Sequence, residues 1–174
     1  RKQMGYTHYW RQHRDFNDTE WWVITRLAKL ITADGLGVLA HHPDAMNGDE
    51  YYGGKEDDIF IIDNEQIRFN GIGEDGHETF LITKKKPEEN FQFCKTAHKP
   101  YDKYVVAVLC AIYHVYLQME KTVMNISSDG NTADWTEGLF HAVRSTRVEE
   151  MYCPIRDCLT LSYVDYVDQK KKTG

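Results

Sequence analysis

Hydrophobic and polar positions follow two different periods along this chain, which predicts both helices and strands. Apolar side chains recur at helical spacing behind Asn17 or Asp18, either of which is a good N-cap, and Glu20 completes a capping box. A stronger helical stripe follows Pro100, and a third follows Thr132. The sequence therefore predicts helices over residues 18–33, 101–120 and 132–147.

Short alternating segments between these helices predict strands. The glycine-rich segment 71–76 has the spelling of a dinucleotide-binding fingerprint, but a strand follows it where the fingerprint needs a helix. It therefore predicts a hairpin turn. The expected strands are 5–11, 59–62, 66–70, 78–84, 91–96, 123–126 and 159–167, with a long loop over 41–58.

These elements predict a single α+β domain over residues 4–148. Its mostly antiparallel sheet is expected to carry about three helices, packed mainly on one face. Residues 149–174 are expected to form a C-terminal extension with the last strand and a frayed basic tail. A chain of 174 residues can build one core without stabilising cross-links.

Composition and charge narrow the function classes. The chain has 27 acidic and 21 basic residues and a net charge of −6, which disfavours a protein that coats nucleic acid. Its apolar runs are far shorter than the roughly 20 residues that span a bilayer. We expect no membrane association, and we expect the four cysteines to be reduced. Neither Cys153 with Cys158 nor His41 and His42 with Asp44 or Asp49 makes a convincing metal site. The sequence predicts no metal and no cofactor.

The junction between the strand 91–96 and the next helix is locally basic. Lys95, His98 and Lys99 surround Thr96, just before a helix N-terminus whose free N–H groups favour anions. This setting suits a phosphate or carboxylate ligand. The alternative is that the lysines are solvated surface charges and that Asp102 only caps the helix.

A second strand-to-helix junction has the same setting. Ser128 and Asp129 lie between the strand 123–126 and the helix 132–147. The two junctions converge if their strands are neighbours in the sheet. The alternative is that these residues form a turn and a cap.

Ring-bearing and nucleophilic residues add two more candidates. Strand alternation places His8 on the same face as Tyr6 and Trp10, which suits stacking against a base and equally suits a buried core histidine. Cys94 is a candidate nucleophile, with His8, His77 or His98 as its base, or else a buried structural cysteine.

Several segments together resemble a known family. They are residues 4–10, 67–71, 78–80, 93–97 with 99–102, and 126–130 with Trp135. Over about residues 4–145, the chain resembles a family of small uncharacterised proteins found in bacteriophages and in bacteria such as actinomycetes. The resemblance implies a phage or bacterial origin, and with it a location in the cytoplasm of the bacterial host cell.

The segments that define the resemblance carry polar groups at strand ends, which suit a shared pocket. We therefore expect the chain to bind a small anionic ligand, a nucleotide or a nucleotide-derived signal, and in a phage setting to sequester a host signal. The expected ligand-binding residues are Tyr6, His8, Trp10, Asn70, Glu78, Thr79, Lys95, Thr96, Lys99, Asp102, Ser128 and Asp129.

Two alternatives remain open at this point. One is a small nucleotide hydrolase or transferase, with His8 or His77 as acid or base and Glu78 or Asp129 as its carboxylate. The other is a protein that inhibits a host enzyme by direct contact, through the acidic loop 44–58.

Overall fold

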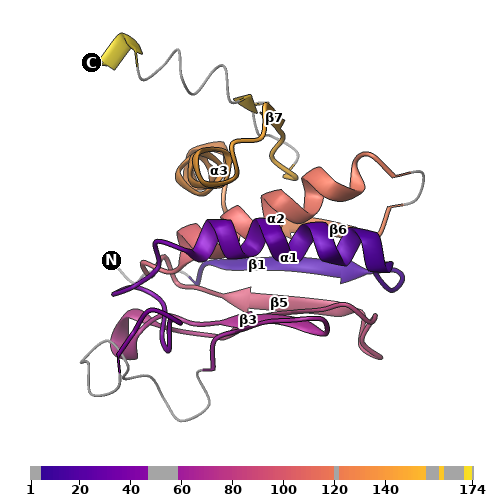
Figure 1. Cartoon of the computed structure of the whole chain (residues 1–174), viewed down its shortest axis with the longest axis horizontal. Helices are drawn as coiled ribbons and strands as arrows, with labels where there is room; N and C mark the ends of the chain where they lie inside the picture. Colours follow the sequence, from indigo (N-terminus) through magenta and orange to yellow (C-terminus); the bar gives the residue numbers. More distant parts are fainter. Residues whose placement is uncertain (1–4, 47–58, 120–121, 156–160, 163–170, 174) are drawn as a thin grey trace.

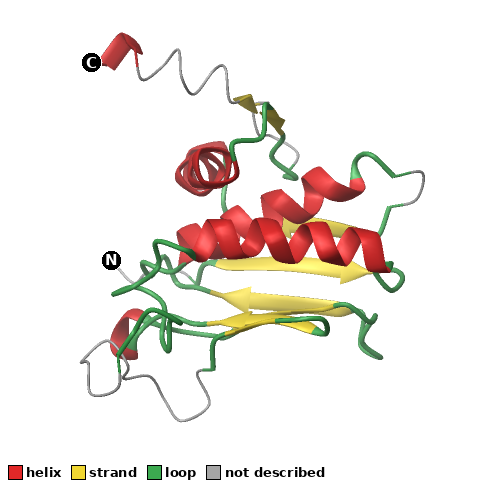
Figure 2. Cartoon of the chain, viewed as in Figure 1, coloured by secondary structure: helices red, strands yellow, loops and turns green. Residues whose placement is uncertain are grey.

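The computed structural model describes residues 5–46, 59–119, 122–155, 161–162 and 171–173. Figure 1 shows α1 (Asp18–Thr32) and α2 (Asp102–Tyr116) lying across one side of the strands, with α3 (Thr132–Thr146) packed farther out. The strands form antiparallel sheets (Figure 2). The predicted α+β class, with an antiparallel sheet and helices on one side, is confirmed.

One three-stranded sheet places β1 between β5 and β6. Its strands are β5 (Phe91–Lys95), β1 (Thr7–Gln12) and β6 (Met124–Ser128), all antiparallel to their neighbours. In this register His8 lies opposite Cys94 on one side and opposite Ser128 on the other. The two strand-to-helix junctions therefore meet at one end of β1.

The second sheet is the predicted meander. It consists of β2 (Ile61–Ile62), β3 (Gln66–Phe69) and β4 (Phe80–Thr83). The connection between β3 and β4 contains a short 3₁₀ turn, Gly73–Asp75, so the glycine-rich segment is part of a hairpin as predicted. No phosphate-binding helix follows it.

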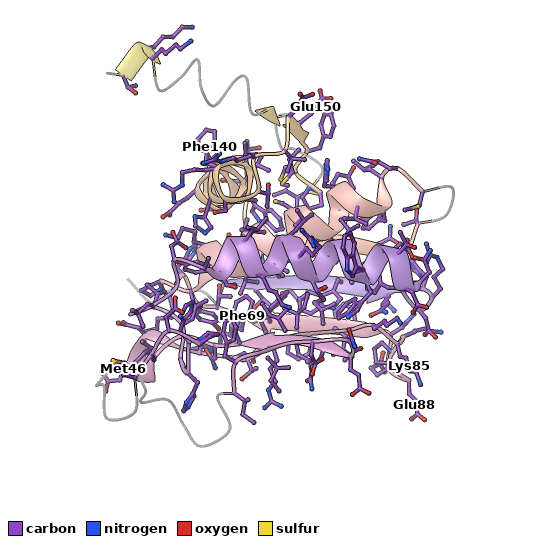
Figure 3. All side chains as sticks on the ribbon, viewed as in Figure 1. Met46, Phe69, Lys85, Glu88, Phe140 and Glu150 are labelled. Atoms are coloured by element: carbon purple, nitrogen blue, oxygen red, sulfur yellow. The ribbon has the colours of Figure 1, made fainter. Side chains whose placement is uncertain are left out.

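The core fills the space between the helices and the strands. Phe69 lies in this layer (Figure 3) and packs against Phe80, which in turn meets the edge of Trp10 with ring centroids 5.6 Å apart. α2 is buried along most of its length because α1 and α3 both pack on it. Gly138 allows this close approach, since a Cβ there would collide with the side chain of Val106.

α2 ends earlier than its apolar stripe predicts. The helix stops at Tyr116, and the following residues form a tighter turn in which Met119 donates its N–H to the carbonyl of Tyr116. Such i→i+3 bonds are common where a last helical turn tightens. The helical spacing of apolar residues continues to Met119 although the helix itself ends at Tyr116. These apolar side chains belong to a hydrophobic surface and do not extend the helix.

α1 begins where the sequence predicts, and Asn17 is its N-cap. The Asn17 side chain accepts the Glu20 N–H, and a Glu20 carboxylate oxygen accepts the Asn17 N–H at 2.8 Å. The buried Glu20 carboxylate also binds both terminal nitrogens of Arg14, at 2.8 and 2.9 Å. This ion pair ties the chain before α1 to the helix itself.

The Glu20→Gln variant is expected to lose about 2 kcal/mol of stability at neutral pH. Breaking a buried ion pair costs roughly 3–5 kcal/mol, and partial exposure of the Arg14 side chain reduces that figure. The hydrogen bond from Arg14 lowers the pKa of the Glu20 carboxyl below its ordinary value of 4.5. The stabilisation is therefore complete above pH 4.5 and is lost as the pH falls through the lower pKa of the folded state.

Urea unfolding at pH 7 and pH 3 measures this effect. We expect the gap in unfolding free energy between wild type and Glu20→Gln to narrow at pH 3. The exposed Glu74→Gln variant is the control and should follow the wild type at both pH values. A gap that is the same at both pH values would contradict the account.

The C-terminal residues differ in part from the predictions. β7 (Glu150–Met151) pairs with β8 (Leu161–Ser162), whereas the rest of the predicted strand 159–167 and the loop residues 47–58 lie outside the described residues. Residues 171–173 form one helical turn. Cys94 and Cys110 are free, as predicted, but Cys153 is disulfide-bonded, so the expectation of reduced cysteines is wrong there.

Among the described residues, no helix has the length and apolar character to cross a bilayer.

Candidate functional site

His8 lies at the centre of a buried hydrogen-bonded series. It is fully buried on the face of β1 that the helices cover. Its Nδ1 is 2.8 Å from the hydroxyl of Ser128, the residue opposite it on β6, and its Nε2 is 2.6 Å from a carboxylate oxygen of Asp102. Strand pairing and the start of α2 therefore bring together three residues that lie far apart in the sequence.

Asp102 is the first residue of α2 and does not cap it. The N-cap is Tyr101, which makes no side-chain capping bond. The Asp102 carboxylate instead accepts bonds from His8 and from the hydroxyl of Thr96, the latter at 2.5 Å. The interpretation of Asp102 as a simple cap is wrong, although the positive end of the helix dipole still stabilises its charge.

For a neutral imidazole, these contacts favour one tautomer of His8. An ionised Asp102 only accepts hydrogen bonds, so the His8 proton belongs on Nε2. Nδ1 is then free to accept the hydroxyl proton of Ser128. This tautomer is assigned from the hydrogen-bond network. The order carboxylate, imidazole, hydroxyl is the arrangement that activates a serine nucleophile.

Ser128 borders a pocket of about 460 Å³. Its Oγ also accepts the N–H of Gly130 at 2.9 Å, which holds the oxygen in place. A pocket of this size suits a small ligand. The other residues that line it are Ile126, Ser127, Gly130, Asn131, Pro154 and Ile155.

Aromatic rings enclose His8. Trp135 and Tyr6 meet it edge to face, with centroid distances of 5.2 and 5.0 Å. His98 stacks on Tyr6 at 3.6 Å, and both Ala97 and His98 adopt left-handed backbone angles, with φ of 52° and 57°. Such angles are costly for non-glycine residues and are found at functional sites. They place the His98 ring over Tyr6, which helps to keep water away from the imidazole of His8.

The Tyr6 hydroxyl lies against Gly130, where a Cβ would collide with it. This hydroxyl is buried and faces the side chain of Ser128. Burial, reinforced by the nearby charge of Asp102, raises the pKa of Tyr6 far above its usual range. Tyr6 is therefore a neutral phenol beside the Ser128 turn.

The structure divides the predicted site residues between the two faces of the sheet. Neighbouring residues on a strand point to opposite faces. Lys95 and Asp129 flank Thr7 in one row across the sheet, on the face opposite His8. Asp129 there accepts the Thr7 N–H and the Tyr9 hydroxyl, both at 3.1 Å. The residues brought together on the helix side are Tyr6, His8, Thr96, Asp102 and Ser128, with Trp10 farther along in the core.

The remaining predicted residues make contacts within the fold. Asn70 binds Thr79 and the backbone of His77, and so holds the β3–β4 connection together. Glu78 accepts the Lys95 N–H at 2.7 Å and joins β4 to β5. Lys99 donates its N–H to the carbonyl of Thr96 at the turn before α2. None of these contacts reaches His8.

Cys94 does not have the properties of a nucleophile. Its thiol is fully buried and lies 3.3 Å from the carbonyl oxygen of Glu78. Burial raises the pKa of Cys94 to about 12, so the thiolate does not form near neutral pH. His42 binds the carbonyl of Thr32, and Asp49 lies outside the described residues. In the part of the chain that the structure describes, no three His, Cys, Asp or Glu side chains are arranged to hold a metal.

Comparison with known proteins gives no family assignment for this chain. No family model, no curated protein and no solved structure matches it.

Proposed function

We propose that this chain is a small serine hydrolase or acyltransferase that acts on an ester. The observation that carries the proposal is the series Ser128–His8–Asp102, which has a pocket at its serine end. The alternative of a nucleotide hydrolase or transferase had Cys94 as its candidate nucleophile, whereas this proposal takes Ser128 as the nucleophile and an ester as the substrate. The sequence marks each of Ser128, His8 and Asp102 as a candidate site residue. That they form one hydrogen-bonded series, in this order, depends on the register of the strands.

The chemistry is acyl transfer in two balanced steps. The Ser128 oxygen attacks the ester carbonyl while its proton passes to His8 Nδ1, and Asp102 stabilises the resulting imidazolium. The tetrahedral intermediate expels the alcohol, which takes that proton, and leaves an acyl group on Ser128. Water, or an acceptor alcohol, then attacks the acyl group by the same route and regenerates the serine.

The surroundings of the serine support this chemistry. The N-terminal end of α3 borders the pocket through Asn131, although the Asp134 carboxylate in its first turn accepts the Asn131 N–H and offsets part of the positive end of the helix dipole. The rings of Trp135 and Tyr6 exclude water from His8, which strengthens the hydrogen bonds of the series.

The other functions stay predictions. At the β5–α2 junction the N-terminal end of α2 already faces the carboxylate of Asp102. Lys95 lies on the face of the sheet opposite His8. This arrangement gives phosphate little electrostatic advantage beside His8. Nucleotide binding, sequestration of a host signal and inhibition of a host enzyme have no comparable set of contacts among the described residues.

A fluorophosphonate probe tests the proposal, because it forms a covalent bond only with an activated serine and releases fluoride. We expect one adduct per chain on Ser128 by intact-protein and peptide mass spectrometry. Ser128→Ala should form none, and Ser145→Ala, which changes a serine on α3 away from the pocket, should react like the wild type. An unmodified wild-type protein, or an adduct at another residue, would overturn the proposal.

A further inference from the structure

The carboxylate of Asp102 is held by two donors on one oxygen atom. Its Oδ1 lies 2.6 Å from His8 Nε2 and accepts the hydroxyl proton of Thr96 at 2.5 Å. The last torsion of an aspartate side chain is soft, so one hydrogen bond alone leaves the carboxylate free to turn. Two donors that come from β1 and from the turn before α2 restrict that rotation.

Thr96 is itself fixed by burial and by its backbone. The residue is fully buried. Its N–H and the N–H of Ala97 both donate to the carbonyl of Tyr6 at 3.1 Å, and its own carbonyl accepts the Lys99 N–H at 3.0 Å. These bonds tie the end of β5 to the start of β1. The hydroxyl of Thr96 is therefore presented to Asp102 from a rigid support.

The turn from Thr96 to α2 follows an unfavourable backbone path. Ala97 and His98 both have left-handed φ angles, of 52° and 57°. Consecutive angles of this kind at non-glycine residues persist only where the surrounding structure imposes them. With the turn in this conformation, Asp102 at the start of α2 lies against Thr96, six residues earlier in the chain.

The titratable groups that face Asp102 here are neutral. Burial raises the pKa of Tyr6, Cys94 and Tyr101, and the nearby charge of Asp102 adds to the effect in each case. A hydrogen bond to a carboxylate is stronger in such surroundings than in water. The bond from Thr96 is therefore well placed to decide where the Asp102 carboxylate points.

We propose that Thr96 is a positioning residue, whose hydroxyl holds the Asp102 carboxylate in the orientation that accepts the His8 N–H. The inference rests on the proposed function, because this orientation affects a rate only if His8 takes the proton of Ser128. Thr96 is fully buried and does not touch a substrate, so it acts through Asp102 and His8. Small displacements of a catalytic group lower rates strongly, and for this reason supporting contacts of this kind matter.

Hydrolysis of p-nitrophenyl acetate tests the role of the hydroxyl. Thr96→Val keeps the shape of the side chain and should lower kcat about 10- to 100-fold, as expected for a lost hydrogen bond to a charged group, with KM nearly unchanged. Thr96→Ser keeps the hydroxyl and should restore most of the rate. The control is Thr32→Val, which changes another buried threonine, whose hydroxyl binds the Ala28 carbonyl within α1 at 2.8 Å. It should keep the wild-type kcat. A wild-type kcat in Thr96→Val, with Ser128 still labelled by the fluorophosphonate, would overturn the inference and leave the proposed function standing.

The proton on His8 Nε2 gives a second readout that does not depend on catalysis. Its short bond to Asp102 should place its NMR resonance far downfield in the wild type. We expect this resonance to move upfield or broaden in Thr96→Val, and to be retained in Thr96→Ser and Thr32→Val. An unchanged resonance in Thr96→Val would reject the positioning role. The expected change in a protein whose Ser128 is inert toward the probe would support the hold on Asp102 and reject the proposed function.

Discussion

Asp102→Asn is expected to lower the rate of ester hydrolysis by about four orders of magnitude. The side-chain amide can donate a hydrogen bond to His8 Nε2, which stabilises the tautomer with its proton on Nδ1. That nitrogen then cannot accept the hydroxyl proton of Ser128. The fold should survive, because Asp102 makes no capping bond and the amide occupies the same space. Steady-state kinetics, with circular dichroism for the fold, measures both parts.

Asp129→Asn is the matched control. This carboxylate is next to Ser128 in the sequence but lies on the opposite face of the sheet, where it binds Thr7 and Tyr9. We expect its rate to stay within about threefold of the wild type, because it takes no part in the proton transfer. Equal losses in Asp102→Asn and Asp129→Asn would show that general carboxylate charge, and not the His8 relay, supports the reaction.

Trp135→Ala should have the largest effect on stability, about 3–5 kcal/mol. Trp135 is fully buried on α3, and its ring packs against the edge of His8. One turn farther along α3, Gly138 already packs against Val106 of α2, which limits how far the two helices can close over the cavity. At roughly 2–4 °C for each kcal/mol, the Tm should fall by about 10 °C.

Two other tryptophan variants separate packing from polarity. The indole N–H of Trp135 has no hydrogen-bond partner among the described residues, so Trp135→Phe keeps most of the packing and loses no bond. We expect it to cost less than about 1.5 kcal/mol. Trp22→Ala removes an exposed tryptophan from α1 and should change the Tm little. If Trp135→Ala is no less stable than Trp22→Ala, the described core is wrong.

Local patterns were sufficient to predict the three long helices and the strands from β1 to β6. The capping box of Asn17 and Glu20 and the apolar stripes depend on neighbouring residues, so they place the helices well. The meander followed from turn chemistry between short apolar runs. These patterns did not predict that α2 ends at Tyr116, because the hydrophobic spacing continues into the turn that follows.

The site depended on non-local geometry. The sequence marked both strand-to-helix junctions, and the structure does join them at His8. The sequence could not show that the Asp102 carboxylate binds His8 instead of capping α2. Nor could it show that Lys95 and Asp129 lie on the face of the sheet opposite His8. A register shift of one residue would exchange those faces. Pairing of β1 with β6 is therefore the information that the sequence lacked.

Trapping an acyl group on Ser128 is the decisive test of the proposed reaction. The protein is mixed with p-nitrophenyl acetate, quenched with acid during turnover and digested for peptide mass spectrometry. We expect a rapid release of p-nitrophenol equal to the enzyme concentration, with one acetyl group on Ser128 and none in Ser128→Ala. Release of p-nitrophenol at the buffer rate, or the same rate in wild type and Ser128→Ala, would contradict it.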